Sequence, residues 1–253
     1  MKKVFSITLS FIVLFSFGQE VEKVNGIDKS NISKIGGVDV GDISNVMGID
    51  FYDACDGETS ILYDGQTYSF VAIGTQCWMA ENLNIGFRMD SGDDLGFFAI
   101  QKYCYDDLDS NCDIFGGLYT WDEAMDWVSV EGAQGICPYG WHIPTDAEWY
   151  TLINFLCGQN GAGGKMKSTG ISLWTTPNDG ATNESGFTGL PGGRFTYWNG
   201  SFEELGNHGY FWSSTESFFL NAWTRYLYYD NDYAFIGSRD QSNGYSVRCL
   251  RDN

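Results

Sequence analysis

Positive charge is scarce in this 253-residue chain. Only 14 residues are lysine or arginine, against 33 aspartate and glutamate residues, and the formal net charge is −19. Binding to a phosphate backbone needs a basic surface, so this balance excludes nucleic acid as a natural partner. It argues against an anionic bilayer surface for the same reason. The chain is nevertheless 43% hydrophobic, which is enough to build a core and excludes a disordered protein.

Long apolar runs are scarce too. The longest, residues 4–17, is short for a membrane span and follows Lys2 and Lys3. Small residues close this run just before Gln19, so we predict that residues 1–18 are a secretory signal peptide. No cysteine lies at the predicted cleavage point, which argues against a lipid anchor there. The mature chain is therefore expected to be secreted or to lie at the cell surface, without a membrane span.

No Cys-x-x-Cys pair exists among the seven cysteines, so zinc binding is the weaker explanation of them. In an oxidising compartment the cysteines of a secreted chain are expected to pair. The predicted disulfides are Cys104–Cys112, across a short polar turn, Cys55–Cys77 and Cys137–Cys249. Cys157 is left over. A competing bond between Cys157 and Cys249 would leave Cys137 free, and spacing alone leaves that choice open.

Histidine is limited to two residues, so a hydrolytic triad would have to use one of them. His142 lies between Trp141 and Ile143, where we expect a buried imidazole bonded to the backbone. His208 lies in a glycine-rich stretch, where we expect an exposed side chain. No Gly-x-Ser-x-Gly elbow accompanies either residue. The sequence therefore assigns no catalytic residue.

Aromatic residues and cysteine are both absent from residues 19–50. This segment repeats every 11 residues, and its units are Val24-Asn-Gly-Ile-Asp28, Ile35-Gly-Gly-Val-Asp39 and Val46-Met-Gly-Ile-Asp50. Each unit joins a short β-branched segment to a glycine turn, so no unit can bury its apolar side alone. Two interpretations stay open: an extended linker, or a small stack of strands that pairs with other copies of itself or with an anchoring protein.

The clearest helix signal follows Pro144, which excludes a helix before it. Thr145 and Glu148 have the spacing of a capping box, and Gly158 can end the helix. The apolar residues that recur at helical spacing between them are Trp149, Leu152, Ile153 and Leu156. A second helix is predicted over residues 121–129, with an apolar face of Trp121, Ala124, Met125 and Val128.

Strand signals lie on both sides of these helices. Residues 61–63 and 67–73 flank Asp64-Gly65, which predicts a hairpin. Glycine, asparagine and serine dominate residues 165–207, where we expect long ordered loops. The late strands are predicted over residues 210–216, 222–229, 233–236 and 245–250, with turns of polar residues between the later ones.

Several stretches of the chain resemble one known family. They are Tyr63-Asp-Gly-Gln-Thr-Tyr68, Ile73-Gly-Thr-Gln-Cys-Trp-Met-Ala-Glu-Asn-Leu83, Leu118-Tyr-Thr-Trp121, Cys137-Pro-Tyr-Gly-Trp-His-Ile-Pro-Thr-Asp-Ala-Glu-Trp149, Gly164-Lys-Met-Lys-Ser-Thr169, Ala181-Thr-Asn-Glu-Ser-Gly-Phe187, Leu190-Pro-Gly-Gly193, Trp212-Ser-Ser-Thr-Glu216 and Ser246-Val-Arg-Cys-Leu-Arg251. In this order they resemble the Fibrobacter succinogenes major paralogous domain over residues 51–253, without the repeats of residues 19–50. The resemblance implies an α+β, C-type-lectin-like domain with two helices, small antiparallel sheets and long loops that carry binding. It also implies a secreted or surface protein with no established activity.

Lectin-like loops raise the question of calcium. Asp107, Asp109, Asn111 and Asp113 alternate as oxygen ligands would, but Cys112 and Leu118 stand at the sixth and twelfth positions, where an EF-hand has glycine and glutamate. An EF-hand is therefore excluded, and the sugar-binding signatures of calcium-dependent lectins are absent as well. We expect no cofactor, and these four residues are only weak candidates for a metal site.

The glutamates of the family motifs are candidates for glycoside hydrolysis, because 33 acidic residues always include some close pair. Glu148 is already assigned to helix capping. For Glu81, Glu184 and Glu216 we expect a structural role in accepting hydrogen bonds from loop amides.

Residues 217–243 are the most promising segment for ligand binding. Tyrosine and asparagine supply large contact area and adaptable hydrogen bonds, as they do in antibody loops. The candidate ligand-binding residues are Asn221, Arg225, Tyr226, Tyr228, Asp230, Asn231, Tyr233, Arg239, Asp240 and Asn243. The alternative is that strands favour tyrosine and bury alternate residues. Related lectin-like proteins can be targets of diversity-generating retroelements, which rewrite adenine-encoded positions in such a segment.

The sequence thus favours an exported binding or adhesion module for an extracellular glycan or protein, and not an enzyme. In this interpretation the repeats act as a spacer or in self-association. One alternative is an enzyme acting on extracellular polysaccharide, which requires two carboxylates in a cleft. Another is a structural surface protein that assembles through its repeats.

Overall fold

The computed structural model describes residues 53–91 and 99–252, together with six two-residue strands between residues 23 and 50. The chain divides into two compact units, Met1–Asp53 and Ala54–Asn253. The predicted signal peptide lies outside the described residues. Within the described residues, no helix is long and apolar enough to cross a membrane.

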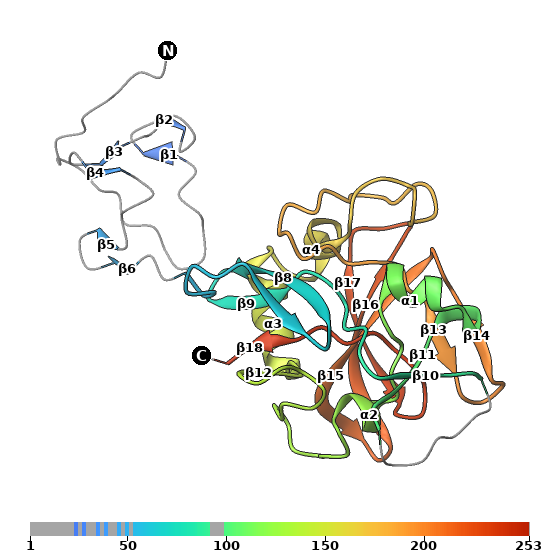
Figure 1. Ribbon diagram of the computed structural model, residues 1–253. Coiled ribbons are helices and arrows are strands. Elements are labelled where there is room, and N and C mark those ends of the chain that lie inside the picture. Colours follow the sequence, from blue (N-terminus) through green and yellow to red (C-terminus); the bar gives the residue numbers. More distant parts are fainter. Residues whose placement is uncertain are drawn as a thin grey trace. The chain divides into compact units, whose positions relative to one another are not determined.

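Each repeat of the first unit contains its own antiparallel strand pair (Figure 1). The pairs are β1 (Lys23–Val24) with β2 (Ile27–Asp28), β3 (Lys34–Ile35) with β4 (Val38–Asp39), and β5 (Asn45–Val46) with β6 (Ile49–Asp50). The two residues between paired strands end in glycine in every repeat, as short hairpin connections favour. The repeat is therefore a hairpin unit. Its service as a spacer or an assembly element stays a prediction.

The second unit contains a five-stranded sheet of order β12-β18-β9-β8-β7. Its strands are β7 (Ser60–Tyr63), β8 (Gln66–Ile73), β9 (Gln76–Met79), β12 (Trp141–His142) and β18 (Leu250–Arg251). The predicted hairpin around Asp64-Gly65 is confirmed as β7 and β8. The last strand, β18, pairs with both β9 and β12, so the end of the chain lies among its early motifs.

A second, three-stranded antiparallel sheet has the order β15-β16-β17. Its strands are β15 (His208–Phe218), β16 (Asn221–Tyr228) and β17 (Ala234–Asp240), and two smaller pairs are β10 (Phe87–Met89) with β11 (Gln101–Tyr103) and β13 (Arg194–Thr196) with β14 (Ser201–Glu203). The strand predicted over residues 245–250 is wrong in extent. Tyr245 and Ser246 make single bridges to Tyr119 and Phe211, and the regular strand begins only at Leu250.

The described residues form four α-helices where the sequence predicted two. They are α1 (Asp109–Phe115), α2 (Trp121–Ala124), α3 (Asp146–Phe155) and α4 (Gln159–Met166), preceded by the 3₁₀ helix η3 (Tyr105–Asp107). The α+β class is confirmed. Helix α1 escaped prediction because Leu108 at its N-cap supplies no side-chain cap.

Helix α2 is shorter than the predicted span of residues 121–129. The carbonyl of Ala124 accepts from the distant amide of Ile136 at 3.0 Å instead of continuing the helix. Asp126 and Trp127 then take positive φ values of 50° and 59°. Val128, expected on the buried face, is 43% exposed. A tertiary hydrogen bond therefore ends this helix, and no local signal marks that end.

Helix α3 confirms the predicted capping box. The Thr145 hydroxyl accepts from the Glu148 amide at 3.2 Å, and the Glu148 carboxylate accepts from the Thr145 amide at 2.8 Å. The Gly158 amide donates to the Ile153 carbonyl at 2.8 Å and closes the helix end. The predicted apolar face is buried, and its Trp149 ring lies 4.7 Å from the Trp78 ring. Helix α3 therefore packs directly onto β9.

Three disulfides join the cysteines as predicted: Cys55–Cys77, Cys104–Cys112 and Cys137–Cys249. Cys157 is free and exposed, so the competing pairing with Cys249 is excluded.

A buried arginine joins the two ends of this unit. Arg248 has no exposed surface, and burial lowers its pKa to about 9, so it stays charged at neutral pH. Its Nε and Nη2 donate to the Asn82 Oδ1 at 3.0 and 2.7 Å. Its Nη1 donates to the carbonyls of Met79 and Phe187, and its guanidinium lies 4.2 Å from the Phe187 ring centre. One side chain thus links the β9 end, the long loop before β13 and the C-terminal segment.

We expect Arg248→Met to destabilise the domain by about 3 kcal/mol or more, because it removes the donor from several buried acceptors at once. Arg248→Lys should also destabilise it, since an ammonium cannot reproduce the planar fork of donors. The matched control is Arg251→Met. Arg251 pairs with the exposed carboxylates of Asp56 and Glu58 at 3.4 Å, and an ion pair of that kind contributes about 1 kcal/mol or less. Its Nη1 also donates to the Cys55 carbonyl at 2.7 Å, a single hydrogen bond worth about 1 kcal/mol, so the loss should stay below that of Arg248→Met. Urea unfolding of the three variants measures the difference, and equal losses for Arg248→Met and Arg251→Met would contradict the role of Arg248.

Candidate functional site

One face of the β15–β17 sheet carries a group of neighbouring aromatic rings. Tyr226 and Phe235 are cross-strand partners, and their rings stack 5.2 Å apart at an angle of 9°. The Tyr228 ring lies 4.9 Å from the Phe235 ring, and the Tyr233 ring lies 5.6 Å from it. Alternate residues of a strand share a face, which explains how Tyr226 and Tyr228 come to lie together. We call Tyr226, Tyr228, Tyr233, Phe235 and Arg239, with His208, the aromatic face.

The aromatic face is partly open to solvent. Tyr226, Tyr228 and Phe235 are half-buried, and Tyr233 is 40% exposed. In contrast, Tyr210 lies across from Tyr226 on β15 and is buried in the core. This face of the sheet is therefore buried at Tyr210 and partly accessible to solvent at Tyr228, Tyr233 and Phe235.

Arg239 lies over this group. Its guanidinium is 5.3 Å from the centre of the Tyr226 ring, a cation–π geometry. Its only hydrogen bond within the described part of the chain is a long one of 3.4 Å to the carbonyl of neighbouring Ser238. Arg88, Arg194 and Arg251, by comparison, each pair with carboxylates. Arg239 therefore keeps donor capacity for a group from outside.

A charged cluster borders the aromatic face on the side of His208. Glu204 accepts from the Tyr210 hydroxyl at 2.6 Å and lies 3.3 Å from Nε of Arg194 and 3.5 Å from Nδ1 of His208. The His208 ring meets the Tyr228 ring edge-on at 4.1 Å. Burial lowers the pKa of His208, against the opposing effect of Glu204, so this imidazole is neutral at pH 7.

The expectation of an exposed His208 in a loop is therefore wrong. His208 opens β15, and its cross-strand partner is Tyr228, whose ring covers it. Phe235, Arg194 and Glu204 were also missed as members of this region. The alternation of Tyr233 and Phe235 could have indicated Phe235. Arg194 and Glu204 lie in a stretch that the sequence predicted as loop, and only the fold brings them to the sheet.

Among the predicted ligand-binding residues, the structure brings Tyr226, Tyr228, Tyr233 and Arg239 together. Arg225 points the opposite way. It is 3% exposed and its Nη2 pairs with the Asp146 carboxylate of helix α3 at 2.6 Å. Burial lowers the pKa of Arg225, with Asp146 opposing that shift. Arg225 thus packs in the interior and cannot contact a ligand at the surface.

The remaining predicted residues make turn contacts. Asn231 Nδ2 donates to Asp230 at 2.9 Å, and its Oδ1 accepts from the Tyr233 amide, so both shape the connection before β17. Asn221 and Asp240 are cross-strand partners at the far end of the sheet. Asn243 accepts from the Tyr197 amide at 3.2 Å beyond that end. Asn221, Asp240 and Asn243 therefore do not join the aromatic face.

Three of the four weak metal candidates have other partners. Asp107 accepts from Ser91, Asp109 pairs with Arg88, and Asn111 donates to the Tyr105 carbonyl. Helix α1 winds the segment from Asp109 onward, so it does not present alternate oxygens to one point. In the described ranges, no group of three or more histidine, cysteine, aspartate or glutamate side chains is placed to hold a metal ion.

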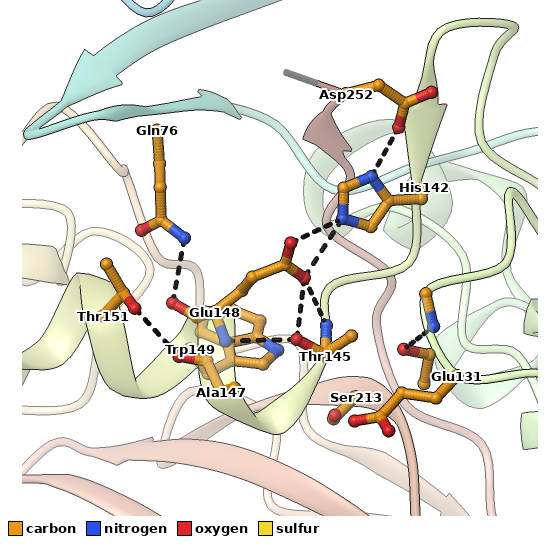
Figure 2. Close-up of polar contacts among 12 residues, drawn as sticks. Gln76, Glu131, His142, Thr145, Ala147, Glu148, Trp149, Thr151, Ser213 and Asp252 are labelled. Carbon is orange, nitrogen blue, oxygen red and sulfur yellow. Dashed lines mark hydrogen bonds and ion pairs between the residues drawn. The ribbon is translucent and has the colours of Figure 1, made fainter.

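His142 bonds to two carboxylates, and the expectation of a backbone-bonded imidazole is wrong. Figure 2 shows its Nδ1 facing Asp252 and its Nε2 facing Glu148. The Nδ1 lies 2.6 Å from an Asp252 oxygen, and the Nε2 lies 3.1 Å from each oxygen of the Glu148 carboxylate. Burial lowers the pKa of His142, but the bonds to Glu148 and Asp252 outweigh burial and raise it. With both ring nitrogens occupied, His142 has no lone pair free to act as a base. It ties the chain end to the start of helix α3.

The other candidate glutamates differ in their roles. Glu81 accepts from the Ser69 amide at 2.8 Å, so it has the structural amide-bonding role expected for it, although this amide belongs to β8 and not to a loop. Glu184 pairs with Lys165 at 2.7 Å, and Glu216 accepts from the Gln241 side chain at 3.2 Å. For those two residues the expected partner was wrong, because each carboxylate binds a side chain from another segment and not a backbone amide.

The His142 cluster should make stability depend on pH. The raised pKa of His142 adds stability that is complete below its ordinary value of 6.5 and is lost as the pH rises through the raised value. The lowered pKa of Glu148 adds stability that is present above its ordinary value of 4.5 and is lost as the pH falls through the lowered value. We therefore expect the gap in Tm between wild type and His142→Gln to be widest between these two ordinary values.

Thermal unfolding of both proteins across the pH range measures that gap. His208→Gln is the matched control, because the pKa of His208 is lowered and not raised. For this pair we expect the opposite trend: the Tm of wild type should increase relative to that of the variant as the pH rises. A gap for His142→Gln that is flat with pH would show that the imidazole is not charged in the folded protein.

The comparisons with known proteins place this geometry in a family. The Fibrobacter succinogenes major domain matches residues 71–251, and no curated protein and no solved structure matches the chain. The match starts inside β8 and ends at β18, so it includes the aromatic face, the Arg248 contacts and His142. It leaves out the repeats, as the resemblance did. Because it covers well over half of the residues, the chain belongs to the Fibrobacter succinogenes major domain family.

Proposed function

We propose that this protein is an exported binding or adhesion module whose ligand contacts the aromatic face. One observation carries the proposal: the rings of Tyr226, Tyr228 and Phe235 pack against one another and remain partly accessible. Tyr68 and Tyr119, by contrast, are fully buried, whereas Tyr139 and Trp198 are each 93% exposed and contact no other ring within the described residues. Accessible rings with hydroxyl groups at their edges combine contact area with hydrogen bonding at low entropic cost.

The size of the aromatic face favours a glycan over a protein ligand. With strands about 4.8 Å apart and a rise of about 3.3 Å per residue, three strands over four residues cover on the order of 150 Å². A stable protein interface needs roughly 800 Å² on each partner. A short oligosaccharide fits the smaller area, since its C–H faces stack on rings while its hydroxyls bond to tyrosine and arginine at the edges.

We propose binding without turnover. His142 uses both ring nitrogens, and Glu81, Glu148, Glu184 and Glu216 are engaged in structural contacts. The rival function, hydrolysis of a polysaccharide, needs two carboxylates held apart across a substrate cleft. Glu203 and Glu204 lie beside the aromatic face, but both pair with Arg194, which gives them a structural role.

Export through the predicted signal peptide is part of the proposal. Three disulfides support it, because such bonds persist in oxidising compartments. We also propose that the domain has a C-type-lectin-like fold. The pairing of the last strand with β9, the small antiparallel sheets and the long segment between α4 and β13 support that assignment. The repeats would serve as a spacer or in assembly, which is also how a structural surface protein would use them.

If a retroelement diversifies residues 217–243, we expect the variable positions to be those whose side chains are accessible to solvent. We expect variation at Tyr228, Tyr233 and their accessible neighbours, and none at Thr224, Arg225 and Leu227, which are buried. Sequencing related loci measures this. A near-repeat of the coding sequence beside a reverse transcriptase gene supports the idea, and variation spread evenly over buried and accessible positions removes it.

Binding should depend on the rings of the aromatic face. We expect Tyr228→Ala and Tyr233→Ala each to weaken glycan binding by about tenfold, since a lost ring contact is worth about 1.4 kcal/mol. The matched control is Tyr139→Ala, because Tyr139 is 93% exposed and lies outside the β15–β17 sheet. A glycan array followed by calorimetry on the tightest oligosaccharide measures the effect, with product analysis on the same samples.

Three outcomes would contradict the proposal. Wild type could bind no glycan on the array, Tyr139→Ala could weaken binding as much as the aromatic-face variants do, or the oligosaccharide could be cleaved. The last outcome would favour the enzyme.

A further inference from the structure

A lysine ammonium is buried next to the aromatic face. Lys167 follows helix α4 and has no exposed surface. Its Nζ donates to three backbone carbonyls, those of Asp179 at 2.7 Å, Tyr228 at 2.8 Å and Asn231 at 2.8 Å. An ammonium has three protons, so every one of them is used. The three carbonyls come from the long loop before β13, the end of β16 and the connection between β16 and β17.

The surroundings keep this ammonium charged at neutral pH. Burial lowers the pKa of Lys167 to about 8, while Asp179, Asp232 and Asp230 oppose that shift. The Trp174 ring lies 5.4 Å from the nitrogen and adds a cation–π contact. The site therefore combines main-chain oxygens, nearby carboxylates and an aromatic ring around a single positive charge.

Carbonyl oxygens that converge on one point are the ligands that proteins use for potassium and, with carboxylates, for calcium. We propose that these three carbonyls form a cation site that the Lys167 ammonium fills from within. The Lys167 side chain thereby fixes the long loop before β13. Removing that side chain would leave a site for a small monovalent cation such as ammonium or potassium.

The same site positions the aromatic face. The Tyr228 carbonyl belongs to the residue whose ring packs on His208 and Phe235. Asn231 and Asp232 lie in the connection between β16 and β17. The Asp232 carbonyl accepts from the Gly164 amide at 3.0 Å, which is a second contact that holds this connection. Without a cation, three carbonyl dipoles would face one another and this connection would move. The consequence for ligand binding rests on the proposed function, whereas the cation site does not.

The first test is Lys167→Met, which shortens the side chain by one atom and removes its charge. We expect its Tm to fall by about 5 °C or more, because three buried acceptors lose their donor. The matched control is Lys165→Met, two residues earlier, where the lost ion pair to Glu184 is exposed and the Tm should change by about 2 °C or less. An equal Tm for Lys167→Met and wild type would overturn the proposal.

The second test is cation rescue in Lys167→Ala. Ammonium or potassium chloride should raise the Tm of this variant in a saturable way and should leave Lys167→Met without such a response. Tetramethylammonium chloride controls for ionic strength, because that ion is too large and has no N–H group. A response equal in tetramethylammonium, or none in ammonium and potassium, would contradict a cation site.

A measurement on wild type guards against variants that do not fold. In ¹⁵N-labelled protein the Lys167 ammonium should show slowly exchanging protons at pH 7, and the partly exposed Lys165 should not. Fast exchange at Lys167 would overturn the proposal. These readouts are independent of any glycan, so failure of the cation site is distinguishable from failure of the proposed binding function.

Discussion

The domain depends on a buried guanidinium that has no carboxylate partner among the residues described. A charge of this kind is expensive to bury unless every proton finds an acceptor. Arg248 meets that requirement with Asn82 and with the carbonyls of Met79, Phe187 and Thr188. These acceptors come from segments more than a hundred residues apart in the chain. Arg248 can be buried only when all of them are in place, so its burial couples the early strand, the long loop and the end of the chain.

Lys167 plays the same role as Arg248, but for an earlier part of the long loop before β13. The loop before β13 has little regular secondary structure, so its backbone carbonyls cannot be satisfied by a strand ladder. Lys167 takes the Asp179 carbonyl and Arg248 takes those of Phe187 and Thr188. In a chain with so few basic residues, two of them serve as internal donors that order a loop. The chain therefore combines a net negative charge with positively charged groups in its interior.

The aromatic face follows from this organisation. The side of β16 that carries Arg225 and Leu227 is fixed against the helices, because Arg225 pairs with Asp146 at the start of helix α3. The opposite side must then present Tyr226 and Tyr228. The Tyr226 ring lies under the Arg239 guanidinium, and both tyrosine rings stay partly exposed. In the proposed function, a ligand that contacts the aromatic face would cause little loss of entropy in the protein, because the support is already ordered.

The sequence by itself determined the features whose partners are close along the chain. The sequence predicted the capping box of Thr145 and Glu148, the hairpin at Asp64-Gly65 and the family motifs. It also predicted three disulfides, but only the structure decided that Cys249 pairs with Cys137 and not with Cys157. Only the tertiary structure decided where α2 ends, because the Ala124 carbonyl is taken by Ile136, and that Arg225 is buried, because Asp146 lies 79 residues away. It also decided that His142 lies between two carboxylates. A hydrogen bond over three or four residues is governed by local geometry, whereas the burial of a charge depends on which distant groups the whole fold brings within 3 Å of it.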